Sequence, residues 1–183
     1  EDAGGFMAGQ WNQIQKNLDA VGGRDSVVRV QDVRRRIELA TLRDHTDEIR
    51  SVAWNAEGTL VASASKDGTV KIWDFVSGDV IHSLEGHNNI VNQVSWHPDS
   101  RRIATGGRDG SVKIWDAITG AEILSLEEHR VAVNTVQWSP DGRKLAAGNL
   151  AGEIIIWDAT RGYESPLDDG PNEAPAVDKP SFQ

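Results

Sequence analysis

Apolar and polar side chains alternate along short segments of this chain, and the alternation recurs at a fixed interval. Within residues 90–116, Val94 and Trp96 alternate with polar neighbours, and a second alternating run ends at Trp115. A period of two residues is typical of half-buried β-strands. The pattern therefore predicts strands over this part of the chain.

One interval contains four predicted strands, which cover residues 90–96, 102–106, 111–116 and 122–126. Turn-forming pairs separate the later strands, namely Asp109-Gly110 and Thr119-Gly120. An Asp-Gly pair between two alternating runs favours a tight hairpin, because glycine adopts a positive φ without steric cost. Each interval is thus predicted to fold as a small antiparallel sheet.

Copies of this unit lie 42 residues before it and 42 residues after it. The spacing of 42 links His45, His87 and His129, then Trp54, Trp96 and Trp138, and finally Trp73, Trp115 and Trp157. Self-similarity at a period of about 40–45 residues, with four strands per unit, is typical of propellers in which each unit is one blade.

With this spacing of histidines and tryptophans, the chain resembles the WD40 repeat proteins. Gly86-His87 and Trp115-Asp116 are dipeptides characteristic of that family, with a spacing of 28 residues between the His and the Trp. The same spacing joins the other two histidines to Trp73-Asp74 and Trp157-Asp158. The resemblance covers residues 45–158 and implies an all-β fold, a WD40 β-propeller to which this chain contributes about four blades.

The repeat spacing divides the chain into five segments: 1–44, a degenerate N-terminal blade or leader; 45–86 and 87–128, two WD40 repeats; 129–166, a repeat with a degraded network; and 167–183, an acidic, Pro-rich tail. In the first segment Gln31 stands where Trp is expected, and Trp11 misses the spacing by one residue. A short helix with Trp11, Ile14 and Leu18 on one face is the alternative for its first half. Pro166 interrupts the last expected strand, residues 162–167.

The resemblance also implies a buried hydrogen-bond chain in each blade, made by the His, a Ser or Thr, the turn Asp and the third-strand Trp. These positions are His45, Ser63, Asp67 and Trp73 in one repeat and His87, Thr105, Asp109 and Trp115 in the next. Such a network fixes packing only when every buried polar group is paired. In the last repeat Ala147 and Ala151 replace the middle members, so His129 and Trp157 are expected to lack them.

A hydrolase triad of Ser63, His45 and Asp67 is the alternative interpretation of the same residues. A catalytic site is not expected to recur at the same place in successive blades, and we therefore expect no enzymatic activity. His82 and His97 lie off the repeat spacing, with no acids at a ligand spacing, so we expect both on the surface. No metal site and no cofactor are predicted.

Composition narrows the possible partners. The 183 residues include no cysteine, which excludes disulfides and thiolate metal sites and fits a cytoplasmic protein, with the nucleus also open. The formal net charge of −9 argues against direct nucleic-acid binding, which usually needs a basic patch. No apolar run is long enough to span a membrane, so no membrane partner is expected.

The expected function is a non-catalytic scaffold that binds a protein or peptide. By the resemblance, partners contact nine loop and strand-end residues: Glu48, Arg50, Lys66, Ile90, Asn92, Arg108, Ala132, Asn134 and Leu150. A ligand would bring a carboxylate or phosphate to Lys66 and Arg108 and an apolar group to Leu150 and Ala132. The alternatives are a solvated face without a ligand, and a regulatory module of a larger kinase or ATPase whose catalytic part lies outside this chain.

Ring closure is the remaining question, because propellers contain typically about 4–8 blades. About four blades from this chain would leave strand edges and blade faces open, which invites aggregation unless they are covered. The chain is expected to be a fragment of a longer propeller, to close a ring with a second copy, or to be completed by another polypeptide.

Overall fold

The computed structural model describes residues 6–162, and these form fifteen β-strands and no helix. The described part therefore contains no helix long and apolar enough to cross a membrane. The strands build four antiparallel sheets, each from strands that follow one another in sequence. We call these sheets blades 1 to 4.

The strands of blade 1 are β1 (Phe6–Trp11), β2 (Leu18–Gly23), β3 (Val27–Asp32) and β4 (Ile37–Arg43). Those of blade 2 are β5 (Ile49–Trp54), β6 (Leu60–Ser65), β7 (Val70–Asp74) and β8 (Val80–Leu84). Those of blade 3 are β9 (Val91–Trp96), β10 (Arg102–Gly107), β11 (Val112–Asp116) and β12 (Glu122–Leu126). Those of blade 4 are β13 (Val133–Trp138), β14 (Lys144–Asn149) and β15 (Ile154–Asp158).

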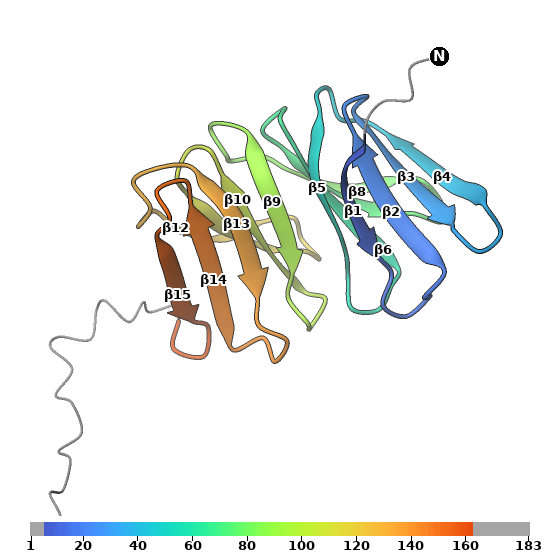
Figure 1. The fold of residues 1–183 in the computed structure, drawn as a ribbon. Helices are drawn as coiled ribbons and strands as arrows, with labels where there is room; N and C mark the ends of the chain where they lie inside the picture. The colour runs from blue at the N-terminus through green and yellow to red at the C-terminus, as the bar shows by residue number, and fades with distance from the viewer. Residues whose placement is uncertain (1–5, 163–183) are drawn as a thin grey trace, which may run out of the picture.

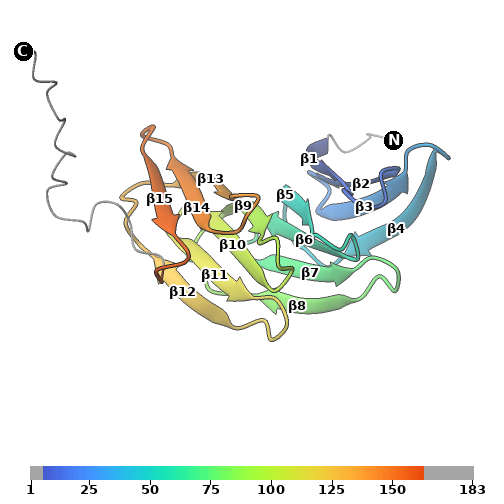
Figure 2. The same cartoon turned by 90° about the horizontal axis from the view of Figure 1, so that it is seen from below.

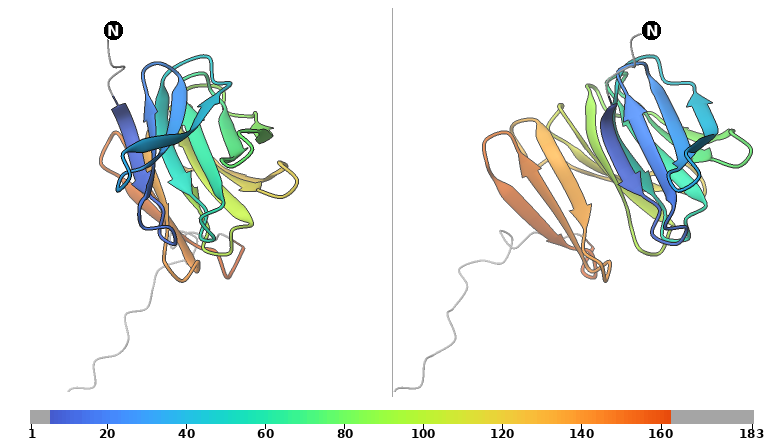
Figure 3. Two further views of the ribbon diagram at one scale, coloured as in Figure 1. Left: turned by 90° about the vertical axis from the view of Figure 1, so that its right-hand side faces the viewer. Right: turned by 45° about the vertical axis from the view of Figure 1, so that its right-hand side comes forward.

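The four blades lie side by side in an open arc (Figure 1). Seen from below, β1, β5, β9 and β13 lie on the inner, concave side, while β4, β8 and β12 lie on the outer, convex side (Figure 2). Blades 1 and 4 are at opposite ends of the arc, as the right-hand view of Figure 3 shows. The predicted all-β, propeller-like fold is confirmed, and the described residues form an incomplete ring.

Apolar side chains that alternate along the second and third strands hold neighbouring blades together. In blade 2, Ala62, Val70 and Ile72 are fully buried against blade 3. The residues one period later, Ala104, Val112 and Ile114, pack against blade 4, and those one period earlier, Ala20, Val28 and Val30, pack against blade 2. The period of 42 therefore repeats an interface between sheets as well as the sheet itself.

Polar side chains join the inner strands of neighbouring blades. Gln93 Oε1 accepts a hydrogen bond from the backbone N–H of Val136, and Ser95 Oγ accepts one from that of Trp138, both at 3.3 Å. Gln10 Oε1 accepts one from the backbone N–H of Trp54 at 2.5 Å. The inner strands are sheet edges, so these bonds satisfy donors that no neighbouring strand reaches.

The helix considered for residues 11–18 is wrong. β1 ends at Trp11 and β2 begins at Leu18, and the Asn12 side chain accepts hydrogen bonds from the backbone N–H groups of the turn between them. Trp11 and Ile14 are exposed whereas Leu18 is buried, so the three share no apolar face. The turn after β1 is one residue longer than the turn after β5, which explains why Trp11 misses the spacing by one.

The surface position expected for His97 is also wrong. The residue is buried, its ring lies edge to face against Trp138 at 4.6 Å between centroids, and its Nε2 hydrogen-bonds the Gly142 carbonyl oxygen at 3.0 Å. A Cβ at position 142 would lie 2.3 Å from the His97 ring, so only glycine fits there. His97 therefore links blade 3 to blade 4. His82 is half-buried, and its Nε2 hydrogen-bonds the Ile118 carbonyl oxygen at 2.8 Å.

Blade 4 differs from the others at its outer edge, where β15 pairs only with β14 among the described residues. The strand expected over 162–167 lies outside the described residues, except for Gly162. Ile154 and Ile156 of β15 are 73% and 42% exposed, although the equivalent residues of blades 1 to 3 are fully buried.

Candidate functional site

Blade 2 contains a continuous hydrogen-bond chain in its interior. His45 Nδ1 donates to Asp67 Oδ2 at 2.7 Å, Ser63 Oγ donates to His45 Nε2 at 2.8 Å, and Trp73 Nε1 donates to Ser63 Oγ at 2.8 Å. The histidine lies before β5, the serine on β6, the aspartate in the β6–β7 turn and the tryptophan on β7. One chain of bonds therefore ties the entry loop to the second and third strands.

Blade 3 repeats this arrangement one period later. His87 Nδ1 lies 2.9 Å from Asp109 Oδ2, His87 Nε2 lies 2.7 Å from Thr105 Oγ1, and Trp115 Nε1 donates to Thr105 Oγ1 at 2.9 Å. Ser111 adds a further hydrogen bond to the Asp109 carboxylate at 2.8 Å. The structure thus brings together all four members of both predicted networks.

The geometry of Ser63, His45 and Asp67 matches that of a hydrolase triad, but the surroundings do not suit catalysis. Ser63 is 0% exposed, so a substrate carbonyl cannot reach its hydroxyl. The same oxygen already accepts a hydrogen bond from the Trp73 indole N–H. Thr105 is equally buried in the copy in blade 3. These residues are placed to hold the blade together.

The two turn aspartates are charged within these networks. Burial raises the pKa of Asp67, but hydrogen bonds from His45 and Thr69 outweigh this effect and hold it well below its usual range. Asp109 behaves in the same way, with His87 and Ser111 as its partners. A carboxylate that accepts several hydrogen bonds favours its ionised form.

Blade 4 replaces the network with other partners. Trp157 Nε1 donates to Glu128 Oε1 at 2.8 Å, and Asn149 Nδ2 donates to His129 Nδ1 at 3.1 Å. Trp157 thus lacks the usual second-strand hydroxyl, as expected, and bonds a different residue, Glu128, which the sequence did not lead us to expect. Glu128 was the available signal, because it occupies the position of Gly86 one period earlier.

His129 keeps an incomplete set of bonds. Its Nε2 is buried and has no hydrogen-bond partner among the described residues, because Ala147 stands where Thr105 serves His87. Burial lowers the pKa of His129, although the carboxylates of Glu153 and Glu128 act in the opposite direction. Blade 4 therefore has the weakest internal support among the three clear repeats.

Two buried lysines were missed by the sequence reasoning. Lys71 Nζ lies 2.5 Å from Asp44 Oδ2, and Lys113 Nζ lies 3.0 Å from Glu122 Oε2. Both lysines lie between two apolar residues on the third strand of their blade. That position could have indicated from the sequence that they are buried. Their aliphatic stems pack in the blade while the ammonium groups reach acidic partners.

The nine residues predicted to contact a partner form three pairs and one row. The backbone N–H groups of Lys66, Arg108 and Leu150 donate to the carbonyl oxygens of Glu48, Ile90 and Ala132 at 2.9, 2.8 and 3.0 Å. Each pair joins the turn after the second strand of a blade to the loop before its first strand. We call the surface formed by these nine residues the loop face.

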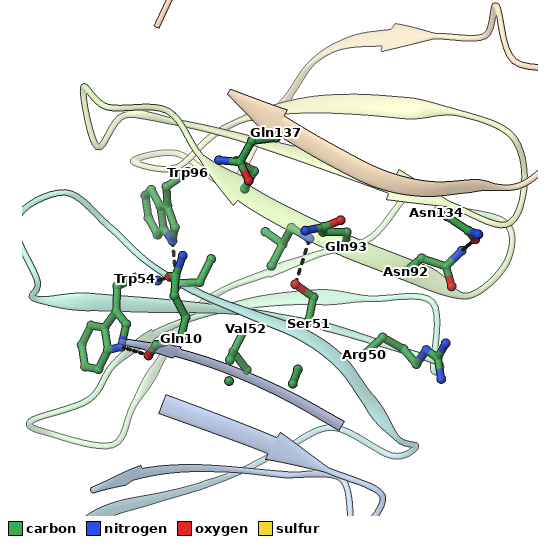
Figure 4. A pocket seen from close by; sticks show the side chains of 15 residues that line it. Gln10, Arg50, Ser51, Val52, Trp54, Asn92, Gln93, Trp96, Asn134 and Gln137 are labelled. Atoms are coloured by element: carbon green, nitrogen blue, oxygen red, sulfur yellow. Dashed lines mark hydrogen bonds between the residues drawn. The ribbon is translucent and has the colours of Figure 1, made fainter. Parts of the chain in front are cut away.

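The remaining three residues, Arg50, Asn92 and Asn134, line a polar cleft of about 530 Å³ between the inner strands (Figure 4). Asn92 Nδ2 donates to the Val133 carbonyl oxygen at 2.8 Å and lies 3.4 Å from Asn134 Oδ1. Side chains of β1, β5, β9 and β13 form the rest of the lining, Gln10 and Gln137 among them. The row therefore runs across three blades at one end of this cleft.

The cationic groups of the loop face differ in their partners. Lys66 Nζ lies 3.7 Å from Asp47 Oδ1. The guanidinium groups of Arg50 and Arg108 form no hydrogen bond or ion pair with any described residue. Leu150 is 65% exposed on the same face. Residues 6–162 contain no cluster of three or more His, Asp or Glu side chains that could hold a metal ion.

Comparison with known proteins agrees with the repeat assignment. The family model described as WD domain, G-beta repeat matches residues 36–74, 78–116 and 120–158, which together make up more than half of the chain. Each match begins near the outer strand of one blade and ends with the third strand of the next.

A local similarity to one curated protein adds little about function. Protein DSE1 of Scheffersomyces stipitis is 44% identical over 46 residues, which are 25% of this chain and only 7% of that protein. The repeated network, the sheet order and the three family matches together show that this chain belongs to the WD40 repeat family.

Proposed function

We propose that this chain is a non-catalytic scaffold whose loop face binds an acidic segment of a protein partner. The supporting observation is the pair of guanidinium groups, Arg50 at the cleft and Arg108 on the loops, that have no partner in the described part of the chain. Arginine presents several donors in a fixed geometry that suits a carboxylate, and it is enriched at the sites that dominate binding energy.

The apolar end of the face adds the second half of the recognition. Leu150 is exposed and Ala132 is half-buried beside it, so an apolar side chain of the partner would bury surface there. A segment with a carboxylate followed by an apolar residue would then contact both ends of the face. The expected partner is therefore a protein or peptide. This proposal accounts for the two guanidinium groups that are unpaired within residues 6–162 better than the alternative, a solvated face that binds no ligand.

The test is a binding measurement on a partner recovered from native lysate by the full chain and then identified and purified. Arg108→Glu should weaken its affinity at least tenfold, about 1.4 kcal/mol. Arg101→Glu is the matched control, since Arg101 is an exposed arginine in the turn between β9 and β10, away from the loop face. Equal affinities for the two variants would refute the proposed site.

A further inference from the structure

The two ends of the arc are chemically unlike. At the far side of blade 4, Ala146, Ile154 and Ile156 form an apolar surface, which we call the C-terminal face. Their neighbours along the strands, Leu145 and Trp157, point the other way and pack against blade 3. The C-terminal face thus corresponds to the surface that every other blade presents to the blade that follows it.

Three built interfaces show what such a face packs against. The residues equivalent to Ile154 are Val28, Val70 and Val112, and those equivalent to Ile156 are Val30, Ile72 and Ile114; all six are fully buried. In each case the following blade supplies an aliphatic residue on its second strand and takes part in the same core cluster. That aliphatic residue is Val61, Ile103 or Leu145.

The inner edge of blade 4 repeats the polar half of these interfaces. Gln93 and Ser95 of β9 accept hydrogen bonds from backbone N–H groups of β13. Thr135 and Gln137 occupy the equivalent positions of β13 and are exposed. Two side chains are therefore placed to accept the same bonds from the inner strand of a further blade.

Blade 1 does not provide the mating surface. Blade 2 has the fully buried Val61 and Trp73 at two facing positions of its second and third strands. Blade 1 has Asp19 and Gln31 at the equivalent positions, which lie opposite each other on β2 and β3. Burial already raises the pKa of the Asp19 carboxyl. Arg29, on the same side, is engaged with Asp25 at 2.5 Å and Glu38 at 3.7 Å. We call this polar surface the N-terminal face.

We infer that the C-terminal face binds a β-blade from outside residues 1–183, and that this blade carries an aliphatic residue and a tryptophan on the strands that face blade 4. The N-terminal face of a second copy does not bind there. Docking a second copy would bury Asp19 against Ile154 and Ile156 without a cation of its own. An uncompensated buried carboxylate opposes association strongly.

Sedimentation velocity of the full chain over a concentration series tests this inference. The wild type and the Ile156→Lys variant should sediment alike, because the wild type is not expected to associate through the C-terminal face. The double variant Asp19→Val, Gln31→Trp should have an N-terminal face that can pack on the C-terminal face of another copy. It should therefore associate head to tail at least tenfold more tightly than the wild type. Adding Ile156→Lys to that variant should abolish the gain. Far-UV circular dichroism and amide exchange in blades 2 and 3 verify that each variant is folded.

Three results would overturn the inference. Wild-type association that is lost with Ile156→Lys would show that a second copy of the chain already covers the C-terminal face. A folded Asp19→Val, Gln31→Trp variant that fails to associate would show that the face does not accept such a blade. Association that appears only after deletion of residues 163–183 would assign the face to that segment instead.

Discussion

Thr105→Val is the substitution that isolates the hydrogen-bond network from packing, because valine keeps the shape of threonine and removes only the hydroxyl. Thr105 Oγ1 serves both His87 Nε2 and Trp115 Nε1, and Thr105 is fully buried. Leaving a buried polar group unpaired costs about 1–3 kcal/mol, so two such groups cost about 2–6 kcal/mol in free energy of unfolding. A domain is stable by only about 5–15 kcal/mol, so the variant should be severely weakened.

Urea denaturation followed by tryptophan fluorescence measures this loss. Thr119→Val is the matched control, since it makes the same chemical change in the exposed turn between β11 and β12, where water can replace the bonds of the hydroxyl to Ala121 and Asp116, and it should cost less than about 1 kcal/mol. Proton NMR of the Trp115 indole N–H gives a local readout, because that proton should lose its protection from exchange. A Thr105→Val variant as stable as Thr119→Val, with the indole proton still protected, would refute the structural role of the network.

Three further predictions follow from the repeats. Ala147→Ser should supply the missing partner of His129 Nε2 and raise the free energy of unfolding by about 1 kcal/mol in urea denaturation; no gain would mean that the hydroxyl cannot reach the ring. Ser26→Gly should raise the thermal unfolding midpoint, since Ser26 has φ 63° where the three later repeats have glycine, and a lower midpoint would contradict this. Because the folded-state pKa values of Asp67 and Asp109 lie below the unfolded value of about 3.9, their stabilisation is complete above that pH and should be lost as the pH falls below about 4. Urea midpoints measured from pH 6 to pH 2.5 should show this loss, and the double Asn variant should show a smaller one.

The repeat spacing allowed most of the fold to be predicted from sequence. The four strands predicted over residues 90–126 agree with β9 to β12 within one residue at each end. Both intact networks were also predicted by position, because all four of their members lie within one blade and recur together. A period carries this information since each copy faces the same local environment.

Contacts that depart from the period could not be predicted in the same way. Glu128 reaches Trp157 only because Ala147 leaves the indole N–H without its usual partner, and this replacement has no copy in blades 2 or 3. His97 bonds Gly142 across two blades, so its burial depends on a contact that a single repeat does not show. The extra residue after Trp11 likewise shifts one strand and hides the first blade from the spacing.

The distribution of these departures follows from the position of each blade in the arc. Blades 2 and 3 have a neighbour on both sides, and both keep the complete network. Blades 1 and 4 each have one neighbour in the described residues, and neither blade has the complete network. Blade 1 has Gln31 at the position of the tryptophan, half-buried on the polar N-terminal face. Blade 4 keeps Trp157 but leaves Ile154 and Ile156 exposed, so a blade docked on the C-terminal face would bury them and stabilise blade 4.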